Sequence, residues 1–176
     1  MTTEYLLHKE VRMVLSALMP QNRLIMEVIL HTGMRISDVL EMRPEHLKPS
    51  GWLVERKTGK RRRYGLPGPL LAEIRAQAGE EWAFPSPKNP AKHKTRQAVW
   101  YDLKRAARAF RLPQNVGTHS LRKVYAVDLM RKYGDIEKVR RNLNHGSDSV
   151  TAIYAMADVL MEQKKRRKSF DKHKSA

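Results

Sequence analysis

Cysteine is absent from the 176 residues of this chain. That absence excludes disulfide bonds, thiolate metal sites and thiol nucleophiles, and it is compatible with a reducing compartment. The sequence also lacks any apolar run near the roughly 20 residues that a membrane-spanning helix requires. Its first residues, MTTEYLLHKEV, do not show the basic segment followed by an apolar one that is typical of a signal peptide. We therefore expect a soluble intracellular protein.

Acidic residues are few, since 18 Asp and Glu stand against 35 Lys and Arg, which gives a formal net charge of +17. The imbalance is confined to one part of the chain. Residues 1–54 contain six basic and six acidic residues, whereas residues 55–176 contain 29 basic and 12 acidic ones. An excess of this size favours a polyanionic partner, above all a nucleic acid. The hydrophobic content of 41% is that of a globular domain with a real core.

Apolar residues recur at helical spacing through most of the sequence. Pro20, Pro44 and Gly134 interrupt the pattern, and Gly33 is well placed to end the second helix in a left-handed conformation. Thr118 is suited to cap the helix that follows it. The predicted helices cover residues 4–18, 24–32, 36–40, 70–78, 96–110, 118–132 and 136–143, with a further one after Ser147 or Asp148.

The segment from Gly51 to Leu66 has a different pattern. Residues 52–54 predict a strand, residues 58–60 a turn and residues 61–66 a returning strand, which together make a small hairpin rich in charge. Residues 84–95, with three prolines and three lysines, predict a mobile loop. Residues from about 155 to 176 are expected to form a basic C-terminal tail. The expected fold is mainly α with a small antiparallel β-hairpin.

Several residues have side chains that suit phosphodiester cleavage. His119 and Arg122 lie one helical turn apart and are followed by His145 and Tyr154. Cleavage concentrates negative charge on the non-bridging oxygens, so a site needs fixed cations, a nucleophile and an acid. Arginine suits the first task because its planar guanidinium gives two parallel hydrogen bonds to phosphate and stays charged at pH 7. Arg35 is a second candidate, because it follows the break between two predicted helices.

Each of these residues also has an ordinary structural explanation. Arg35 could form a surface ion pair with Asp38. His119 could cap the start of its helix, and His145 could interact with the free carbonyls at a helix C-terminus. Tyr154 could be a core tyrosine with its hydroxyl at the surface. Only the order and spacing of the whole set point to a common site.

That order resembles the tyrosine recombinase family, also called phage integrases. The family pattern is a T-G-x-R-x-x-E/D-L motif, a lysine at a hairpin turn, an H-x-L-R box, and an L-G-H motif followed by a tyrosine. The matching blocks in this sequence are Thr32–Leu40, Arg56–Lys60, His119–Arg122, Leu143–His145 and Ile153–Ala155. Asn144 stands where the family has glycine, and asparagine tolerates a left-handed conformation better than most residues. The resemblance implies the α+β fold of the tyrosine recombinase catalytic domain.

The resemblance also implies a chemical role for each candidate. Tyr154 would attack the scissile phosphate in DNA and form a 3′-phosphotyrosine with release of a 5′-hydroxyl. Arg35 and Arg122 would bind the non-bridging oxygens, and His145 would add a hydrogen bond to the same charge. The two arginines would take the place of metal cations, so no metal is implied. No cofactor is implied either, because the phosphotyrosine conserves the free energy for rejoining and the sequence has no G-x-x-x-x-G-K-[ST] loop.

Proton transfer would fall to two further residues. His119 would act as the acid/base group near the tyrosine, and Lys57 would protonate the leaving oxygen. Asp38 is expected to orient Arg35 without taking part in the chemistry. Other basic residues of the hairpin are expected to contact the DNA backbone. These DNA-binding candidates are Lys60, Arg61, Arg62 and Arg63.

Family members usually carry a separate core-binding domain before the catalytic one, and we expect residues 1–176 to be a single catalytic domain without it. The resemblance implies double-stranded DNA as the partner, a tetramer on DNA and a monomer without it. It also implies a cytoplasmic, DNA-associated protein that is bacterial or phage-encoded. With half of the clamp around DNA missing, binding by this chain alone should be weak and salt-sensitive.

Three other functions are compatible with parts of the sequence. A type IB topoisomerase would use the same catalytic set to relax supercoils. A DNA-binding accessory protein could keep the fold without using the site, although it would have no need of all six catalytic candidates. A basic RNA- or ribosome-binding protein would explain the charge but not the order of the motifs. DNA strand exchange is the function that uses every block.

Overall fold

The structure is a computed structural model that describes residues 3–143. The chain divides into two compact units, Met1–Tyr125 and Ala126–Ala176. Most of the described residues are helical, and the strands form two antiparallel pairs, so the predicted fold class is confirmed. The elements are α1 (His8–Ala17), α2 (Pro20–Thr32), α3 (Ile36–Leu40), a 3-10 helix η1 (Pro44–His46), β1 (Ser50–Val54), β2 (Arg61–Gly65), α4 (Gly68–Gln77), β3 (Pro85–Ser86), β4 (Asn89–His93), α5 (Arg96–Ala109), α6 (Thr118–Tyr133) and α7 (Ile136–Leu143).

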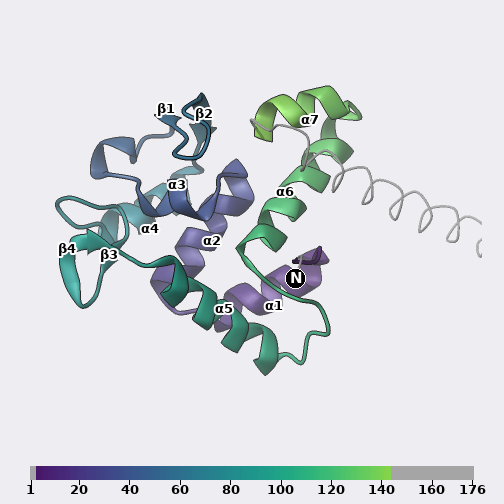
Figure 1. Cartoon of the computed structure of the whole chain (residues 1–176), viewed down its shortest axis with the longest axis horizontal. Helices are drawn as coiled ribbons and strands as arrows, with labels where there is room; N and C mark the ends of the chain where they lie inside the picture. The colour runs from purple at the N-terminus through teal and green to yellow at the C-terminus, as the bar shows by residue number, and fades with distance from the viewer. Residues whose placement is uncertain (1–2, 144–176) are drawn as a thin grey trace, which may run out of the picture. The chain divides into compact units, whose positions relative to one another are not determined.

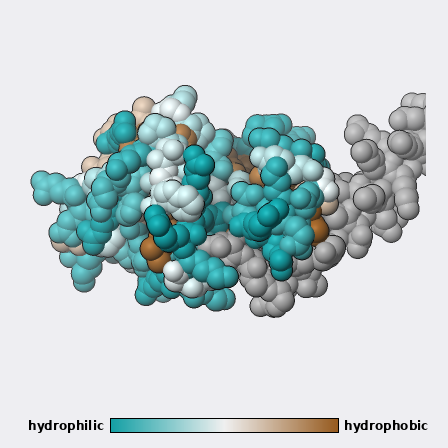
Figure 2. Space-filling view, turned by 90° about the horizontal axis from the view of Figure 1, so that it is seen from above, coloured by the Kyte–Doolittle hydropathy of each residue, from teal (hydrophilic) through white to brown (hydrophobic). Residues whose placement is uncertain are grey.

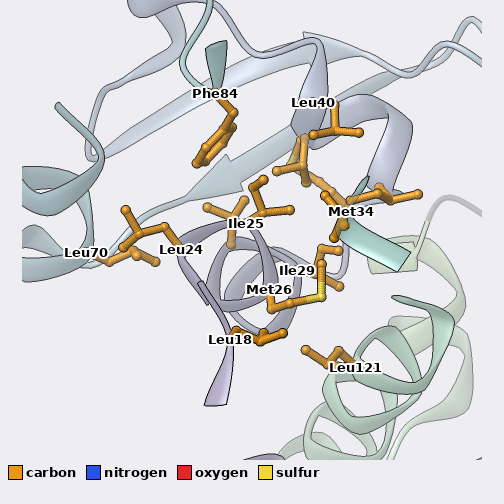
Figure 3. Close-up of a cluster of buried hydrophobic side chains, with 14 of the residues drawn as sticks. Leu18, Leu24, Ile25, Met26, Ile29, Met34, Leu40, Leu70, Phe84 and Leu121 are labelled. Atoms are coloured by element: carbon orange, nitrogen blue, oxygen red, sulfur yellow. The ribbon is translucent and has the colours of Figure 1, made fainter. Parts of the chain in front are cut away.

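Helix α2 is the centre of the first unit. It begins with Pro20, whose missing N–H would have no partner in the first turn of a helix. It contacts α1, α3, α4 and β2, and these neighbours bury most of its surface (Figure 1). Figure 3 shows its side chains in the core with Phe84 and with Leu121 of α6. Because Leu121 is fully buried there, the core fixes the face of α6 on which the next residue, Arg122, lies.

The start of α6 differs in detail from the sequence prediction. Thr118 is the first helical residue, so Gly117, and not the predicted Thr118, occupies the position before the helix. The hydroxyl that accepts a hydrogen bond here is that of Ser120, which receives the Gly117 N–H at 3.1 Å. Ser120 is 0% exposed, so this bond closes the first turn from inside the protein. The start of the helix is therefore fixed by a buried serine one residue after His119.

The hairpin predicted between residues 51 and 66 is confirmed. Strands β1 and β2 pair antiparallel, with Leu53 opposite Arg62 and Trp52 opposite Arg63. Side chains alternate between the two faces of a strand. Leu53, Arg62 and Tyr64 are accordingly buried, whereas Trp52 and Arg63 are exposed. The two faces of the hairpin therefore have different environments, although both carry arginine.

Residues 84–95 contain a second hairpin where the sequence predicted a loop. Strands β3 and β4 pair antiparallel across Pro85↔His93 and Ser86↔Asn89. The prolines misled the prediction, because proline lacks the N–H that a central strand must donate. In a two-stranded hairpin each strand is an edge, so a missing donor can face solvent. The ends are also anchored, since Phe84 is buried and its carbonyl accepts the N–H of Lys94 at 2.9 Å.

In the second unit, Gly134 ends α6 with a φ of 65°, as the sequence predicted. Asp135 then caps α7, because its Oδ1 accepts the backbone N–H of Glu137 at 2.8 Å. Val139 and Leu143 are the buried residues of α7, which confirms the predicted helix. The predicted helix after Ser147 or Asp148 and the basic tail lie outside the described residues.

The face drawn in Figure 2 is largely hydrophilic, and its hydrophobic residues form separate small spots. Within residues 3–143, no helix combines the length and apolar character that crossing a membrane would require.

Candidate active site

The turn between α2 and α3 brings Arg35 to the site. Gly33 has a φ of 63°, which glycine adopts without strain. A Cβ on Gly33 would also lie 2.2 Å from the ring of Tyr125 on α6, so no larger residue fits in this packing. Thr32 supports the turn, since its hydroxyl donates to the Val28 carbonyl at 2.6 Å and accepts the Met34 N–H at 3.2 Å. The side chain of Arg35 therefore projects from this turn in a fixed direction.

Glu55 is the carboxylate around which the site is built. Its side chain is 0% exposed and lies at the end of β1, beside the hairpin turn. Its Oε2 accepts Nη1 of Arg35 at 2.8 Å, and its Oε1 accepts Nη1 of Arg62 at 3.0 Å. Arg62 also donates from Nη2 to the carbonyl of Thr32, in the turn that precedes Arg35. One carboxylate therefore connects two buried guanidinium groups.

The pKa of Glu55 follows from these bonds. Burial by itself would raise the pKa of the carboxyl, but hydrogen bonds from Thr58, Arg62 and Arg35 outweigh it, so the pKa lies below its ordinary value. Glu55 is therefore ionised at neutral pH. An ionised carboxylate can balance only one of the two guanidinium charges that it bonds.

Arg122 adds a third guanidinium to the same cluster. Its side chain is 5% exposed, and its pKa is lowered to about 9, first by burial and then by the positive charges of Arg62 and Arg35. Glu55 and Asp38 act in the opposite direction. A guanidinium keeps its proton at pH 7 even so. The lowered pKa therefore means that the charge of Arg122 is held at a cost, mainly because of burial and further because of the neighbouring guanidiniums, and a bound anion would offset that cost.

Asp38 supports the site through the backbone. Its Oδ1 accepts the backbone N–H of Arg56 at 3.0 Å, which ties α3 to the end of β1. Burial raises the pKa of Asp38, the hydrogen bond from Arg56 lowers it, and the charge of Glu55 raises it again, with a net increase. The carboxylate bonded to the guanidinium of Arg35 is thus that of Glu55, where the sequence analysis had singled out Asp38.

His119 lies on the exposed side of α6, one turn before Arg122. Its pKa is lowered by partial desolvation of the ring, then by the charges of Arg122, Arg96, Arg35 and Lys123. The imidazole is therefore mainly neutral at pH 7, the form that can accept a proton.

Lys57 lies at the tip of the β1–β2 hairpin and is exposed. The turn that carries it is closed by a backbone hydrogen bond from Glu55 to the Lys60 carbonyl at 3.0 Å, and another from Gly59 to the Glu55 carbonyl at 2.8 Å. Gly59 has a φ of 65°, which such a tight turn requires. Lys57 is thus two residues from the carboxylate that bonds Arg35.

The other basic residues of the hairpin divide into two groups. Lys60, Arg61 and Arg63 are exposed, as a contact with DNA requires. Arg62 is 4% exposed and bonded to Glu55, which contradicts its assignment to the DNA-binding surface. The reason is the alternation of β2, which turns every second side chain inward. Arg62 belongs to the buried cluster, whereas Arg61 packs over the ring of Trp52 at 5.3 Å.

The structure therefore brings Arg35 and Arg122 into one cluster and places His119 within range of their charges. His145 and Tyr154 lie outside the described residues. The residues that sequence reasoning missed are Glu55 and Thr58. One signal was present, because Glu55 is the only acidic residue between positions 55 and 66, a stretch rich in lysine and arginine.

Comparisons with known proteins identify the family. The sequence model of the phage integrase family matches residues 4–160. A probable integrase/recombinase of Bacillus subtilis is 31% identical over 135 residues, which cover 73% of this chain and 74% of that protein. The tyrosine recombinase XerA of Pyrococcus furiosus is 31% identical over 143 residues, covering 76% of this chain and 49% of that protein.

Solved structures show the same fold. The crystal structure of a XerA recombinase has a TM-score of 0.71 at 17% identity and covers 90% of this chain and 63% of that one. The catalytic core of lambda integrase has a TM-score of 0.69 at 19% identity and covers 84% of this chain and 94% of that one. The chain spans less than half the length of some relatives that it matches, such as 42% of a putative integrase/recombinase of Sinorhizobium fredii.

Proposed function

Because the chain belongs to the phage integrase family, we propose that it cleaves and rejoins double-stranded DNA at specific sites through a 3′-phosphotyrosyl intermediate. The observation that carries the proposal is the cluster of Arg35, Arg62 and Arg122 around Glu55. It is a buried site in which three guanidiniums lie close enough to influence one another, and the fold fixes their positions. Such preorganised charge is what the transition state of phosphoryl transfer requires.

The mechanism assigns one task to each residue. Tyr154 attacks the scissile phosphorus while the bond to the 5′ oxygen breaks, and its phenolic proton passes to the neutral imidazole of His119. Arg35 and Arg122 bind the non-bridging oxygens, joined by His145. Lys57 gives a proton to the leaving 5′ oxygen. Rejoining reverses these transfers, with the 5′-hydroxyl as the nucleophile.

The assembly follows from the same proposal. The curated relatives are named integrases and recombinases, and one lambda integrase structure is a tetramer bound to a Holliday junction. We infer that this chain is a monomer in the absence of DNA and assembles on DNA, in the cytoplasm that holds its substrate. The exposed residues Lys60, Arg61 and Arg63 contact the phosphate backbone.

A covalent-capture experiment tests the proposal. The protein is incubated with a pool of nicked duplexes whose arms are randomised, so that a cleaved strand diffuses away and the intermediate accumulates. SDS-resistant adducts are isolated and their DNA is sequenced. We expect adducts attached through the 3′ end of the retained strand, with a free 5′-hydroxyl on the released strand.

Two variants give the controls. Tyr154→Phe should form no adduct, whereas Tyr133→Phe, a change at a tyrosine on α6 that has no role in the mechanism, should form as much as the wild type. Adducts that persist in Tyr154→Phe would refute the nucleophile. An absence of adducts with every duplex would favour a DNA-binding protein that does not use the site, and relaxation of supercoiled plasmid without strand exchange would favour a topoisomerase.

A further inference from the structure

The side chain of Thr58 links the hairpin turn to the buried cluster. Its hydroxyl donates to Oε2 of Glu55 at 2.8 Å and accepts the backbone N–H of Lys60 at 3.3 Å. The first bond reaches into the buried site, and the second closes the turn at the surface. Thr58 is half-buried, in keeping with a position between these two environments. The residue immediately before it is Lys57.

The oxygen that Thr58 bonds is also the one that bonds Arg35. Oε2 of Glu55 accepts both Nη1 of Arg35 and Oγ1 of Thr58, each at 2.8 Å. A single atom with no exposure to solvent thus connects the arginine and the turn. Hydrogen bonds to an ionised acceptor in a buried place are stronger than ordinary ones. The turn therefore has a fixed position relative to Arg35.

Proton donation by Lys57 depends on a turn that is held in place in this way. Its own side chain is exposed, and holding a long exposed side chain in one place costs conformational entropy. Proton transfer to the leaving oxygen requires hydrogen-bond reach at the moment the bond breaks. The position of the backbone at residue 57 decides whether the ammonium can reach that oxygen.

We propose that Thr58 is a positioning residue for Lys57, acting through Glu55, so that the arginine that binds the phosphate also fixes the lysine that protonates the leaving group. The inference rests on the proposed function, because it needs Lys57 as the proton donor and Arg35 as the phosphate ligand. It predicts a defect specific to leaving-group protonation when the Thr58 hydroxyl is removed.

The test compares two leaving groups on one duplex recovered from the covalent-capture pool. In the second version, sulfur replaces the bridging 5′ oxygen. The phosphorus–sulfur bond breaks with departure of a thiolate, which needs no proton because thiols have a pKa of about 8.5. The rate of adduct formation in a single turnover is measured for both versions. A variant that disturbs only Lys57 should form the adduct slowly with the substrate that has a bridging oxygen and rapidly with the substrate that has a bridging sulfur.

We expect Thr58→Val to lower the rate on the oxygen substrate by about 10- to 100-fold, as misplacement of a catalytic group does, and to react with sulfur at nearly the wild-type rate. Thr58→Ser keeps the hydroxyl and should be close to wild type on both. Lys57→Ala should be rescued by sulfur in the same way, whereas Arg35→Ala should remain slow on both.

The outcomes separate the two proposals. If sulfur fails to rescue Lys57→Ala, Lys57 is not the proton donor and the proposed mechanism loses that role. If sulfur rescues Lys57→Ala but Thr58→Val is equally slow on both substrates, the positioning role of Thr58 is overturned while the proposed function stands.

A second measurement needs no DNA. Hydrogen exchange at the amides of Gly59 and Lys60 reports the order of the turn, and the chain is small enough for residue-level detection by NMR. Thr58→Val should speed this exchange by about five- to tenfold, the equivalent of one lost hydrogen bond, with no change for Thr58→Ser. Unchanged exchange in Thr58→Val would overturn the inference, because the turn would then hold its place without the hydroxyl.

Discussion

Arg62 points into the first unit, where it is 4% exposed, whereas its neighbours Arg61 and Arg63 lie on the outer face of the same strand. The three side chains are chemically identical and adjacent in sequence. The buried one bonds Glu55 and the Thr32 carbonyl, so its guanidinium has one position. The exposed ones have water as an alternative partner, and their charges are screened by salt over about 10 Å at 0.1 M.

The whole site shows the same contrast between buried and exposed arginines. Arg35, Arg62 and Arg122 carry their charges in a buried environment. Charge in such an environment costs free energy, as the lowered pKa of Arg122 indicates. That cost lowers the stability of the free protein and increases the benefit of binding an anion. The exposed basic residues carry no such cost and provide affinity that depends on salt. Burial therefore separates the arginines that act on one phosphate from those that attract DNA in general.

The largest effect should come from removing the carboxylate at the centre of the buried group. We expect Glu55→Gln to lower the free energy of unfolding by about 3–5 kcal/mol, because two buried guanidiniums lose their counter-charge. Urea denaturation at pH 7 measures this. The matched control is Glu41→Gln, which removes the partner of the largely exposed Arg56 and should cost at most about 1 kcal/mol.

The same pair of variants has a pH dependence with a defined sign. The pKa of Glu55 is lowered in the folded state, so its stabilisation is present above its ordinary value of 4.5 and is lost as the pH falls through the folded-state value. The difference between wild type and Glu55→Gln should therefore shrink below pH 4.5. If both the Glu55 and Glu41 variants lose the same free energy of unfolding at pH 7, the distinction between buried and exposed charge is wrong.

A second prediction separates stability from activity at Arg122. Its pKa is lowered to about 9, so below that pH its charge is held at a cost in the folded state. We expect Arg122→Met to retain or raise the free energy of unfolding at pH 7, while adduct formation falls by about 100- to 1000-fold. Arg63→Met, the exposed control, should alter neither quantity by as much. A large loss of stability in Arg122→Met would contradict the expectation that the buried charge of Arg122 is held at a cost.

A third prediction concerns the neutral imidazole beside the cluster. Partial desolvation and the neighbouring cations lower the pKa of His119 below its ordinary value of 6.5. As a base it works only when deprotonated, so the rate of adduct formation should rise with pH through a value below 6.5 and level off near pH 7. In His119→Gln the rate should no longer rise with pH in this range, and it should be lower at every pH by about 100-fold or more. If the rate still rises with pH in the glutamine variant, the titrating group is not His119.

The sequence predicted the α-helices of residues 3–143 and the first hairpin because these depend on local patterns. Gly33 marks a left-handed helix end, and Arg35 follows it at a fixed spacing. The role of Glu55 depends on contacts between residues 35, 55 and 62, which are not adjacent in sequence. A local sequence pattern cannot predict such contacts. Arg62 and Tyr64 alternate with exposed residues along β2 and mark its inward face, but the run of three arginines hides this alternation in the sequence. The prolines of residues 84–95 concealed a hairpin in the same way.

The smallest effects should come from the exposed face of that strand. Arg61→Gln and Arg63→Gln should each leave the free energy of unfolding within about 0.5 kcal/mol of wild type, because neither side chain is buried. If each residue contacts one phosphate, the slope of log Kd against log salt should fall by about 0.9 for each change. Titration of a fluorescent duplex at several salt concentrations measures the slope. An unchanged slope in the double variant would mean that the outer face of β2 does not contact DNA, and the basic residues beyond the hairpin would then have to supply the salt-dependent affinity.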